Sequence, residues 1–294
     1  MNLLRPPPLH PGSHVRIIAP SGPFDRALVL RGLAWLTSRY RISFERGLFA
    51  RQGFLAGDDQ RRLDELVAAI SDPSVDAIVT ARGGHGLLRI IHAVPWGRLR
   101  ECPKWIVGFS DPTALHAEAW KVGVASLHAA NVAGLGRGHD ESRNEWRRCL
   151  EHPEAGRTLA GFGLIAGRVR GPVVGGNLTV LTMLAAANRL RFPEGCILLL
   201  EDVTETSYRI DRMLAVLRVG GHLDRVAAIA FGEFTDCSGG LFRVSVESVI
   251  EAFLDGSLPA IAGLPVGHGV RNVPIPFGAE ATLDGATGTL VFAP

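Results

Sequence analysis

Two short segments share one design: AIVTARGGHG at residues 77–86 and WIVGFSDPT at residues 105–113. Each begins with an apolar run of strand length and ends in glycine or polar residues that favour a turn. The segment HVRIIAPSG at residues 14–22 has the same form. These three runs predict buried strands that each end in a turn.

A helical pattern at residues 58–70 lies between the strand predicted in 14–22 and the strand predicted in 77–86. Its apolar residues fall at i, i+3, i+4 and i+7, and they are Leu63, Leu66, Val67 and Ile70. Asp58 or Asp59 is well placed as the N-cap. Strands that alternate with helices predict crossover connections, and therefore an α/β fold with a mostly parallel sheet.

The second half of the chain has a different organisation. Periodicity weakens over residues 136–170, where Gly, Arg and His dominate, and we expect a linker there. This interpretation divides the chain into an N-terminal domain at 1–135 and a C-terminal domain at 171–294, with a cleft between them.

Within the C-terminal domain, residues 177–187 look helical and CILLL at 196–200 reads as a buried strand. The next helix carries one apolar face, made by Ile210, Met213, Leu214 and Leu217. The Gly- and Pro-rich end of the chain predicts loops and short β segments rather than helices.

Composition excludes several classes of function. The 294 residues include 31 Lys and Arg against 29 Asp and Glu, a net charge of +2. This balance gives no electrostatic basis for binding nucleic acid or an anionic membrane. The N-terminus lacks the apolar core of a signal peptide, and no apolar run approaches the length of a spanning helix.

The cysteines and histidines give no metal-binding pattern. The four cysteines are far apart in the sequence, without a C-x-x-C pair, and we expect reduced thiols in a cytoplasmic protein. No H-E-x-x-H or H-x-H spacing occurs among the ten histidines. The sequence therefore predicts neither a metal nor a cofactor.

The glycine clusters invite a nucleotide-binding interpretation that their spacing does not support. Neither the cluster at 134–138 nor the one at 83–86 has the G-x-G-x-x-G spacing, and no Walker A sequence is present. The loop at 83–86 follows a strand, so it is either a tight turn that needs positive φ or a loop whose backbone N–H groups face a ligand or an oxyanion. The segment alone favours neither.

Ser110 occupies a predicted strand–turn–helix junction. The plain interpretation makes Asp111 a helix N-cap, with Pro112 at the first helical position. The functional interpretation places Ser110 at the carboxyl end of a parallel sheet and directs the Asp111 N–H at a carbonyl under attack. The segment is not a G-x-S-x-G elbow, because Pro112 stands where the last Gly would be.

Candidate acids and bases lie near other strand ends. Glu201 and Asp202 follow CILLL, and Glu201 is the better candidate to orient a histidine. For Asp202 a capping role is the alternative, and for Glu205 plain surface exposure. His268 lies between two glycines, whereas His85 and His128 are the competing bases; sequence position does not choose among the three.

Read together, these segments resemble the LD-carboxypeptidase family of serine peptidases, which includes muramoyltetrapeptide carboxypeptidases and microcin C self-immunity peptidases. The resemblance rests on segments in the family's order, spread over nearly the whole chain. They are VRIIAPSGP (15–23), ARGGHG (81–86), IVGFSDPTAL (106–115), SLH (126–128), GGNLTVL (175–181), LLLEDVTETSYRIDRML (198–214), FGEFTDC (231–237) and LPVGHG with RNVPIPFG (264–278).

The resemblance implies a catalytic triad of Ser110, Glu201 and His268, in the serine–acid–histidine order that unrelated hydrolases also use. It implies an oxyanion hole made by the backbone N–H groups of Gly84 and Asp111. It also implies an N-terminal Rossmann-like domain, a C-terminal β-rich α/β domain, a site at their junction and a homodimer.

The implied reaction removes a terminal D-amino acid from an L-centre, with a cytoplasmic murein tetrapeptide losing D-alanine as the expected substrate. An alternative within enzymes is an immunity peptidase that cleaves peptidyl-nucleotide amides, and a rival from another class is a silent peptide-binding protein. Specificity is less constrained, because His85 and Ala129-Ala130 depart from the family's usual Tyr and Gly-Pro. Arg82 is the sequence candidate for binding a terminal carboxylate, with a surface ion pair as its alternative.

Overall fold

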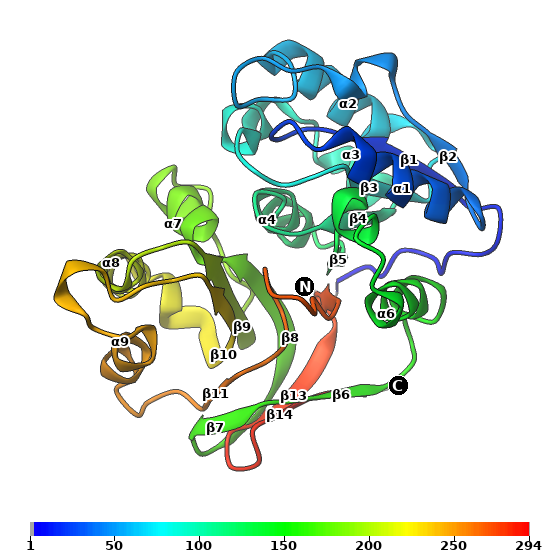
Figure 1. Ribbon diagram of the computed structural model, residues 1–294. Coiled ribbons are helices and arrows are strands. Elements are labelled where there is room, and N and C mark those ends of the chain that lie inside the picture. Colours follow the sequence, from blue (N-terminus) through cyan, green and yellow to red (C-terminus); the bar gives the residue numbers. More distant parts are fainter. Residues whose placement is uncertain (1–2, 294) are drawn as a thin grey trace. The chain divides into compact units, whose positions relative to one another are not determined.

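The computed structural model describes residues 3–293, which divide into two compact units (Figure 1). The first unit comprises the chain up to Pro153 together with Pro274–Pro276. The second comprises Glu154–Val273 and the chain from Phe277 onward. The chain therefore enters the second unit, returns to the first for three residues and leaves it again.

The first unit is built on a parallel sheet. Its elements are β1 (His14–Ile18), α1 (Arg26–Thr37), β2 (Arg41–Ser43), η1 (Arg46–Phe49), α2 (Asp59–Ser71), β3 (Ala77–Thr80), η2 (Leu87–Arg89), η3 (Ile91–Ala93), α3 (Gly97–Glu101), β4 (Trp105–Gly108), α4 (Thr113–Lys121), β5 (Ser126–His128), α5 (Val132–Leu135) and α6 (Asp140–Glu151). In the described chain the strand order is β2-β1-β3-β4-β5, with β12 (Ile275–Phe277) beyond β5.

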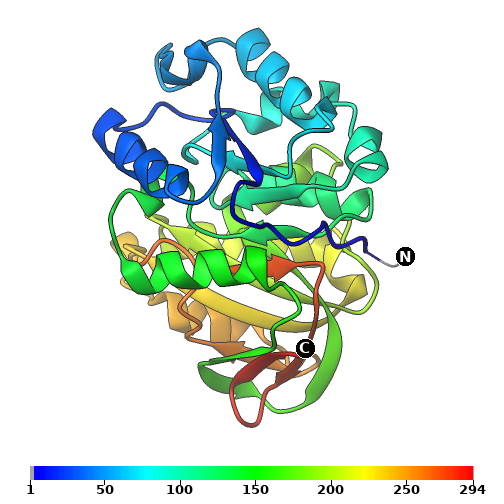
Figure 2. The same ribbon diagram turned by 90° about the vertical axis from the view of Figure 1, so that its right-hand side faces the viewer.

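This strand order explains where the functional loops of the first unit gather. The pairs β1–β2, β1–β3, β3–β4 and β4–β5 are all parallel. Every residue of β3 and β4 is buried, as expected for strands covered on both faces. Helices flank the sheet, with α1 packed on α5 and α2 on α3 (Figure 2). Loops after β1, β3 and β4 therefore meet at one edge, where doubly wound folds bind ligands.

The sequence-predicted helix of this unit is confirmed as α2. Asp58, rather than Asp59, is its N-cap, because the Asp58 side chain accepts the Arg61 N–H at 2.7 Å. Leu66 and Ile70 of the predicted apolar face are fully buried.

The second unit is built on a mixed sheet with the order β6-β14-β13-β8-β9-β10-β11-β7 in the described chain. Its elements are β6 (Arg157–Ala160), β7 (Phe162–Ile165), β8 (Arg168–Asn177), α7 (Leu178–Ala186), β9 (Cys196–Val203), α8 (Ser207–Val219), η4 (His222–Arg225), β10 (Val226–Thr235), η5 (Gly240–Phe242), α9 (Val246–Phe253), β11 (Ala260–Ala262), β13 (Glu280–Asp284) and β14 (Thr289–Phe292). The strands β8 to β11 are parallel, and the outer pairs are antiparallel.

Two sequence expectations for the second half differ from the structure. Residues 136–170, expected to be a linker, hold α6, β6 and β7. The strand expected at 196–200 is longer and ends at Val203. Glu201 still pairs with Asn177 of β8, and Asp202 still pairs with Phe234 of β10. The two carboxylates therefore lie within the end of a buried strand rather than after it.

Candidate active site

Ser110 follows β4 directly in an uncommon backbone conformation. Its φ is +73°, a left-handed value that a non-glycine residue rarely adopts and that commonly accompanies functional sites. The Ser110 carbonyl accepts the Thr113 N–H at 2.8 Å, which joins the turn to α4. The sharp turn between strand and helix supports a nucleophilic role for this serine.

The glycine loop after β3 packs against this serine. A Cβ at position 83 would lie 2.8 Å from the Ser110 Cβ and 3.0 Å from its Oγ, so only glycine fits there. Gly84 has φ +109°, and the Gly22 N–H donates to the Gly83 carbonyl at 3.1 Å. The loop is therefore a turn that needs positive φ, and it lies against the candidate nucleophile.

Two backbone N–H groups of the first unit bear on the oxyanion prediction. Within residues 3–293, neither the Gly84 N–H nor the Asp111 N–H donates to a protein acceptor. These are the two groups for which the sequence predicted a role in stabilising an oxyanion.

The expected capping role of Asp111 is wrong. Helix α4 begins at Thr113 and has no side-chain cap. The buried Asp111 carboxylate instead accepts the Leu87 N–H at 3.0 Å. Burial raises the pKa of Asp111, and this hydrogen bond opposes the rise. Asp111 thus joins the segment after β3 to the turn that holds Ser110.

His116 supports the same turn and was missed by the sequence analysis. This buried residue of α4 has Nε2 at 3.0 Å from the Gly108 carbonyl and Nδ1 at 2.9 Å from the Ser126 hydroxyl. The carbonyl requires a donor, so Nε2 carries the proton and Nδ1 accepts. Burial lowers the pKa of His116 to about 3, with help from nearby His128. His116 is therefore a neutral clamp between β4 and β5.

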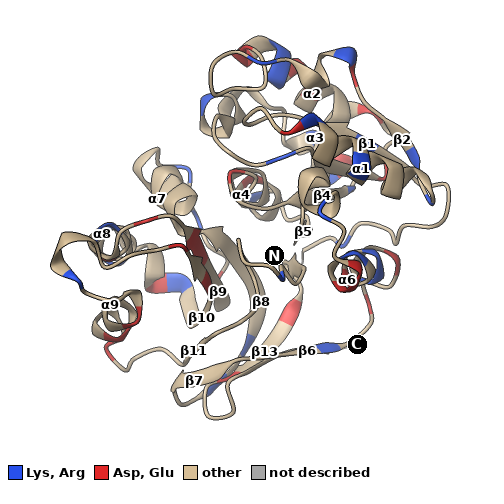
Figure 3. Cartoon of the chain, viewed as in Figure 1, with Lys and Arg blue, Asp and Glu red and all other residues tan. Residues whose placement is uncertain are grey.

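In the second unit, Glu201 and His268 form a hydrogen-bonded pair. The His268 Nδ1 lies 2.8 Å from Oε2 of Glu201, which is fully buried near the end of β9, where Figure 3 shows acidic residues. Because the carboxylate accepts the proton of Nδ1, the neutral imidazole has its basic lone pair on Nε2. This arrangement is the one by which an acid orients a histidine as a general base.

The loop that carries His268 is shaped around this carboxylate. Gly267 has φ +131°, and a Cβ there would lie 3.0 Å from Oε2 of Glu201. The Gly267 N–H donates to the Asn272 side chain at 3.2 Å, and the Val266 carbonyl accepts the Glu233 N–H at 2.8 Å. The glycines around His268 thus allow the chain to pass close to a buried acid.

The neighbouring carboxylates have other partners. Asp202 accepts the Thr179 N–H in the first turn of α7 at 2.9 Å and a hydrogen bond from the Asn177 side chain, and Asn177 is the N-cap of that helix. Glu205 forms an ion pair with Arg209 at 3.5 Å and is half-buried rather than exposed.

The other sequence candidates of the first unit have different environments. His85 is exposed, with its ring 5.7 Å from that of Phe54, and His128 is buried beside Phe109. Arg82 is exposed and donates to the Pro23 carbonyl at 2.5 Å, rather than forming an ion pair within the described chain.

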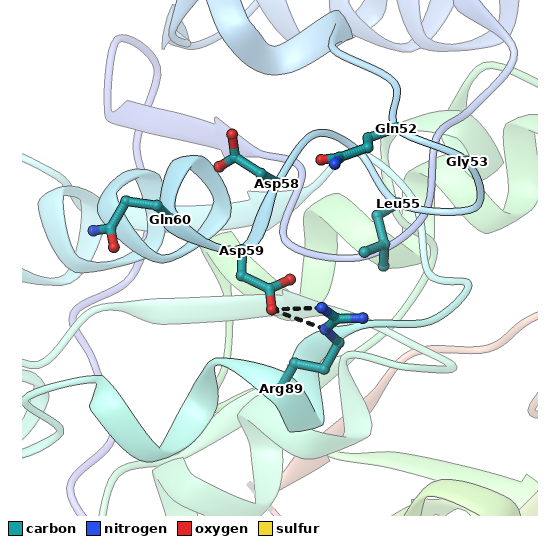
Figure 4. Close-up of a pocket in the computed structure, with 7 residues that line it drawn as sticks. All are labelled: Gln52, Gly53, Leu55, Asp58, Asp59, Gln60 and Arg89. Carbon is teal, nitrogen blue, oxygen red and sulfur yellow. Dashed lines mark hydrogen bonds and ion pairs between the residues drawn. The ribbon is translucent and has the colours of Figure 1, made fainter.

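A separate pocket of about 640 Å³ lies at the start of α2 in the first unit (Figure 4). Figure 4 shows Arg89 directed at Asp59, and the Arg89 Nε lies 2.9 Å from the carboxylate. Although burial would raise it, the pKa of Asp59 is lowered by hydrogen bonds from Arg89 and Arg62. The charges of Asp59, Arg89 and Arg62 therefore compensate one another.

Searches for two other kinds of site gave negative results. Among the described residues, no group of three or more His, Cys, Asp or Glu side chains is arranged to hold a metal ion. Over the same part of the chain, no helix has the length and apolar character needed to cross a membrane.

Sequence comparison matches both halves of the chain to one family. Residues 15–129 match the LD-carboxypeptidase N-terminal domain, and residues 170–283 match the LD-carboxypeptidase C-terminal domain. A putative carboxypeptidase of Synechocystis sp. is 38% identical and covers 99% of this chain and 98% of its own. The murein tetrapeptide carboxypeptidase of Pseudomonas aeruginosa is 33% identical over 80% of this chain and 81% of its own.

Solved structures have the same fold. Muramoyltetrapeptide carboxypeptidase from Oxalobacter formigenes gives a TM-score of 0.86 at 26% identity and covers 96% of this chain and 99% of its own. The microcin C7 self-immunity protein MccF in complex with aspartyl sulfamoyl adenosine gives 0.87 at 20% identity, covering 99% and 98%. At 20% identity, the likeness to MccF shows a shared fold only.

These matches define the class of protein as a serine-type carboxypeptidase, a hydrolase. More narrowly, the chain belongs to the LD-carboxypeptidase family.

Proposed function

We propose that this protein hydrolyses the amide bond between an L-centre and a terminal D-amino acid, and that its substrate is a murein tetrapeptide that loses D-alanine in cell-wall recycling. The hydrogen bond between His268 and Glu201 carries the proposed mechanism, because it prepares an imidazole to accept a proton at Nε2. The likeness to a murein tetrapeptide carboxypeptidase supports the choice of substrate.

In the proposed mechanism, His268 takes the proton of Ser110, and Ser110 attacks the carbonyl of the terminal amide. The Gly84 and Asp111 N–H groups stabilise the oxyanion, and one such donor is typically worth about 2.7–4 kcal/mol. His268 then protonates the leaving amine, and water hydrolyses the acyl-enzyme. Glu201 stabilises the imidazolium throughout.

We further propose that the first unit supplies the nucleophile and the second supplies the acid and the base, in a cytoplasmic homodimer. Four cysteines spread along the sequence without a C-x-x-C pair support a reducing compartment.

Recognition of the substrate's terminal carboxylate calls for a cationic group, and we propose Arg82 for this role. The exposed Arg82 side chain follows β3 and opens the loop that packs on Ser110.

The test compares three tetrapeptides: the free acid, its terminal amide, and the epimer that ends in L-alanine. We expect D-alanine release from the first, with kcat/KM reduced by at least about 10-fold for the other two, since a charged hydrogen bond is lost or misplaced. Arg82→Ala is expected to erase most of the preference for the free acid, whereas Arg98→Ala, in an exposed ion pair of α3, is the matched control. Equal rates on all three peptides would overturn the carboxypeptidase assignment. Faster cleavage of a peptidyl-adenylate analogue would favour an immunity peptidase instead.

A further inference from the structure

Arg62 is a fully buried cation in the first turn of α2. Its Nη1 donates to the Pro20 carbonyl at 2.5 Å and to the Gly86 carbonyl at 3.0 Å. Pro20 belongs to the loop after β1, and Gly86 ends the glycine loop after β3. One guanidinium nitrogen therefore joins both loops to α2.

These two loops meet at Gly84. A Cβ on Gly84 would lie 3.2 Å from the N and the Cα of Gly22, so the two backbones are in close contact. Pro20 lies two residues before Gly22. Gly86 lies two residues after Gly84. Because Arg62 binds both of those carbonyls, it holds the backbone on each side of the contact.

The glycine loop is shaped to receive this guanidinium. Gly86 has φ +131°, and a Cβ there would lie 2.6 Å from Nη1 of Arg62. The guanidinium therefore reaches the Gly86 carbonyl only because residue 86 has no side chain.

Asp59 compensates the charge of Arg62. Nη2 of Arg62 donates to Oδ1 of Asp59, and Oδ2 of Asp59 lies 2.9 Å from Nε of Arg89 (Figure 4). A buried charge is costly unless it is paired and hydrogen-bonded. Of the three acceptors of this guanidinium, only Asp59 belongs to α2, whereas the other two are loop carbonyls. The contacts of Arg62 thus serve the loops more than the helix.

We propose that Arg62 is a positioning residue, which holds the glycine loop so that the Gly84 N–H is directed at the oxyanion. This inference rests on the proposed carboxypeptidase function. Because Arg62 is fully buried, it acts through the loop backbone and not by contact with the peptide. Its contribution should therefore be larger in the transition state, where the oxyanion forms, than in the bound substrate.

The test compares Arg62→Met with Lys104→Met. Lys104 is the matched control, because it is also fully buried and donates to backbone carbonyls, those of Ala69 and Asp72 at the other end of α2. Arg62→Met is expected to lower kcat for D-alanine release by about 100-fold at nearly unchanged KM, as for a catalytic group misplaced by about 1 Å. Lys104→Met is expected to lose stability but to keep the wild-type kcat.

Two further measurements separate positioning from a general loss of stability. A peptide trifluoromethyl ketone forms a tetrahedral adduct with a catalytic serine, and its affinity should fall in Arg62→Met in parallel with kcat/KM, because the adduct carries an oxyanion. Amide hydrogen exchange over residues 81–87 should be faster in Arg62→Met than in Lys104→Met.

Arg62→Lys replaces Arg62→Met if the methionine variant does not fold. It keeps the positive charge but lacks the planar fork of donors, so its kcat should fall by about 10-fold at unchanged KM. A wild-type kcat in a folded Arg62 variant, or an equal loss of kcat in Lys104→Met, would overturn the inference and leave the proposed function standing. Absence of D-alanine release by the wild-type protein would instead overturn the proposed function, and the inference with it.

Discussion

The turn that holds Ser110 and the loop that holds His268 position their side chains by different means. Ser110 is held by backbone shape: a positive φ, a glycine in van der Waals contact and a neutral histidine clamp. His268 is held by charge, since Glu201 accepts from its ring and Glu233 lies beside its loop. We therefore expect the first region to be sensitive to added volume and the second to removed charge.

The largest effect is expected from Ser110→Ala, which removes the proposed nucleophile without adding volume to the turn. Turnover should fall by roughly 10³- to 10⁶-fold, as when a triad serine is lost. Assays of D-alanine release, with melting curves to verify folding, measure this. Ser257→Ala, in the loop before β11, is the control. Turnover like that of the wild type in Ser110→Ala would refute the serine mechanism.

Glu201→Gln tests the role of charge in the second region. The substitution keeps the side-chain shape but removes the negative charge that orients the imidazole and stabilises its protonated form, so kcat should fall by about 10³- to 10⁴-fold. Glu205→Gln breaks only an ion pair with Arg209 at the edge of α8 and should cost far less. Greater sensitivity at Glu205 would move the acid of the triad by four residues.

Gly83→Ala tests the role of shape in the first region. The added methyl group would lie 2.8 Å from the Ser110 Cβ, so the serine must move. A displacement of this size is expected to lower kcat by about 10- to 100-fold, with a smaller change in KM. Gly97→Ala at the start of α3 has no heavy atom within 4 Å of the new methyl group and should keep full activity. Equal activities of the two variants would mean that the glycine contact has no functional importance.

The smallest effect is expected at His116, which acts on Ser110 only through the Gly108 carbonyl. His116→Leu removes one of the two donors to that buried carbonyl, which also accepts the Ala129 N–H at 3.0 Å, and should lower kcat by about 10-fold at unchanged KM. His116→Gln restores an N–H donor and should recover most of the loss. Failure of glutamine to rescue activity would assign His116 a packing role only.

His116 also predicts a pH dependence of stability. Its pKa falls from an ordinary 6.5 to about 3 in the folded protein. Between these values the unfolded chain binds a proton that the folded chain does not, so the unfolding free energy decreases as pH falls through this window. Melting temperatures between pH 6.5 and the onset of acid unfolding should therefore decline less steeply in His116→Gln than in the wild type. Parallel declines would contradict the neutral clamp.

Patterns in the sequence predict the strands and α2 because those patterns are local. The apolar runs AIVT and WIVG form buried parallel strands, and Asp58 caps the helix where a capping residue was expected. Local rules failed at Asp111, which has the sequence of an N-cap but accepts the N–H of Leu87, 24 residues before it in the chain. A hydrogen bond to a residue distant in the chain cannot be predicted from the residues that flank Asp111.

The candidate site shows the same division. Gly84 and Gly267 have positive φ, and both belong to glycine clusters that are visible in the sequence. The role of His116 is not visible there, because it arises from contacts of α4 with β4 and β5 that form only in the folded chain. The sequence shows only a histidine on an apolar helix, whereas the structure shows its hydrogen bond to the Gly108 carbonyl.

The brief return of the chain to the first unit limits how the gene can be divided. Residues 274–276 lie more than 120 positions beyond Pro153, and Ile275 and Pro276 belong to β12, the strand next to β5 in the first unit's sheet. An open reading frame that stops at residue 153 would encode β5 without this neighbour. Its unpaired edge would then be free to pair with other chains and promote aggregation. Expression of the first unit as a separate polypeptide therefore requires the 274–276 segment to be grafted on or supplied in trans.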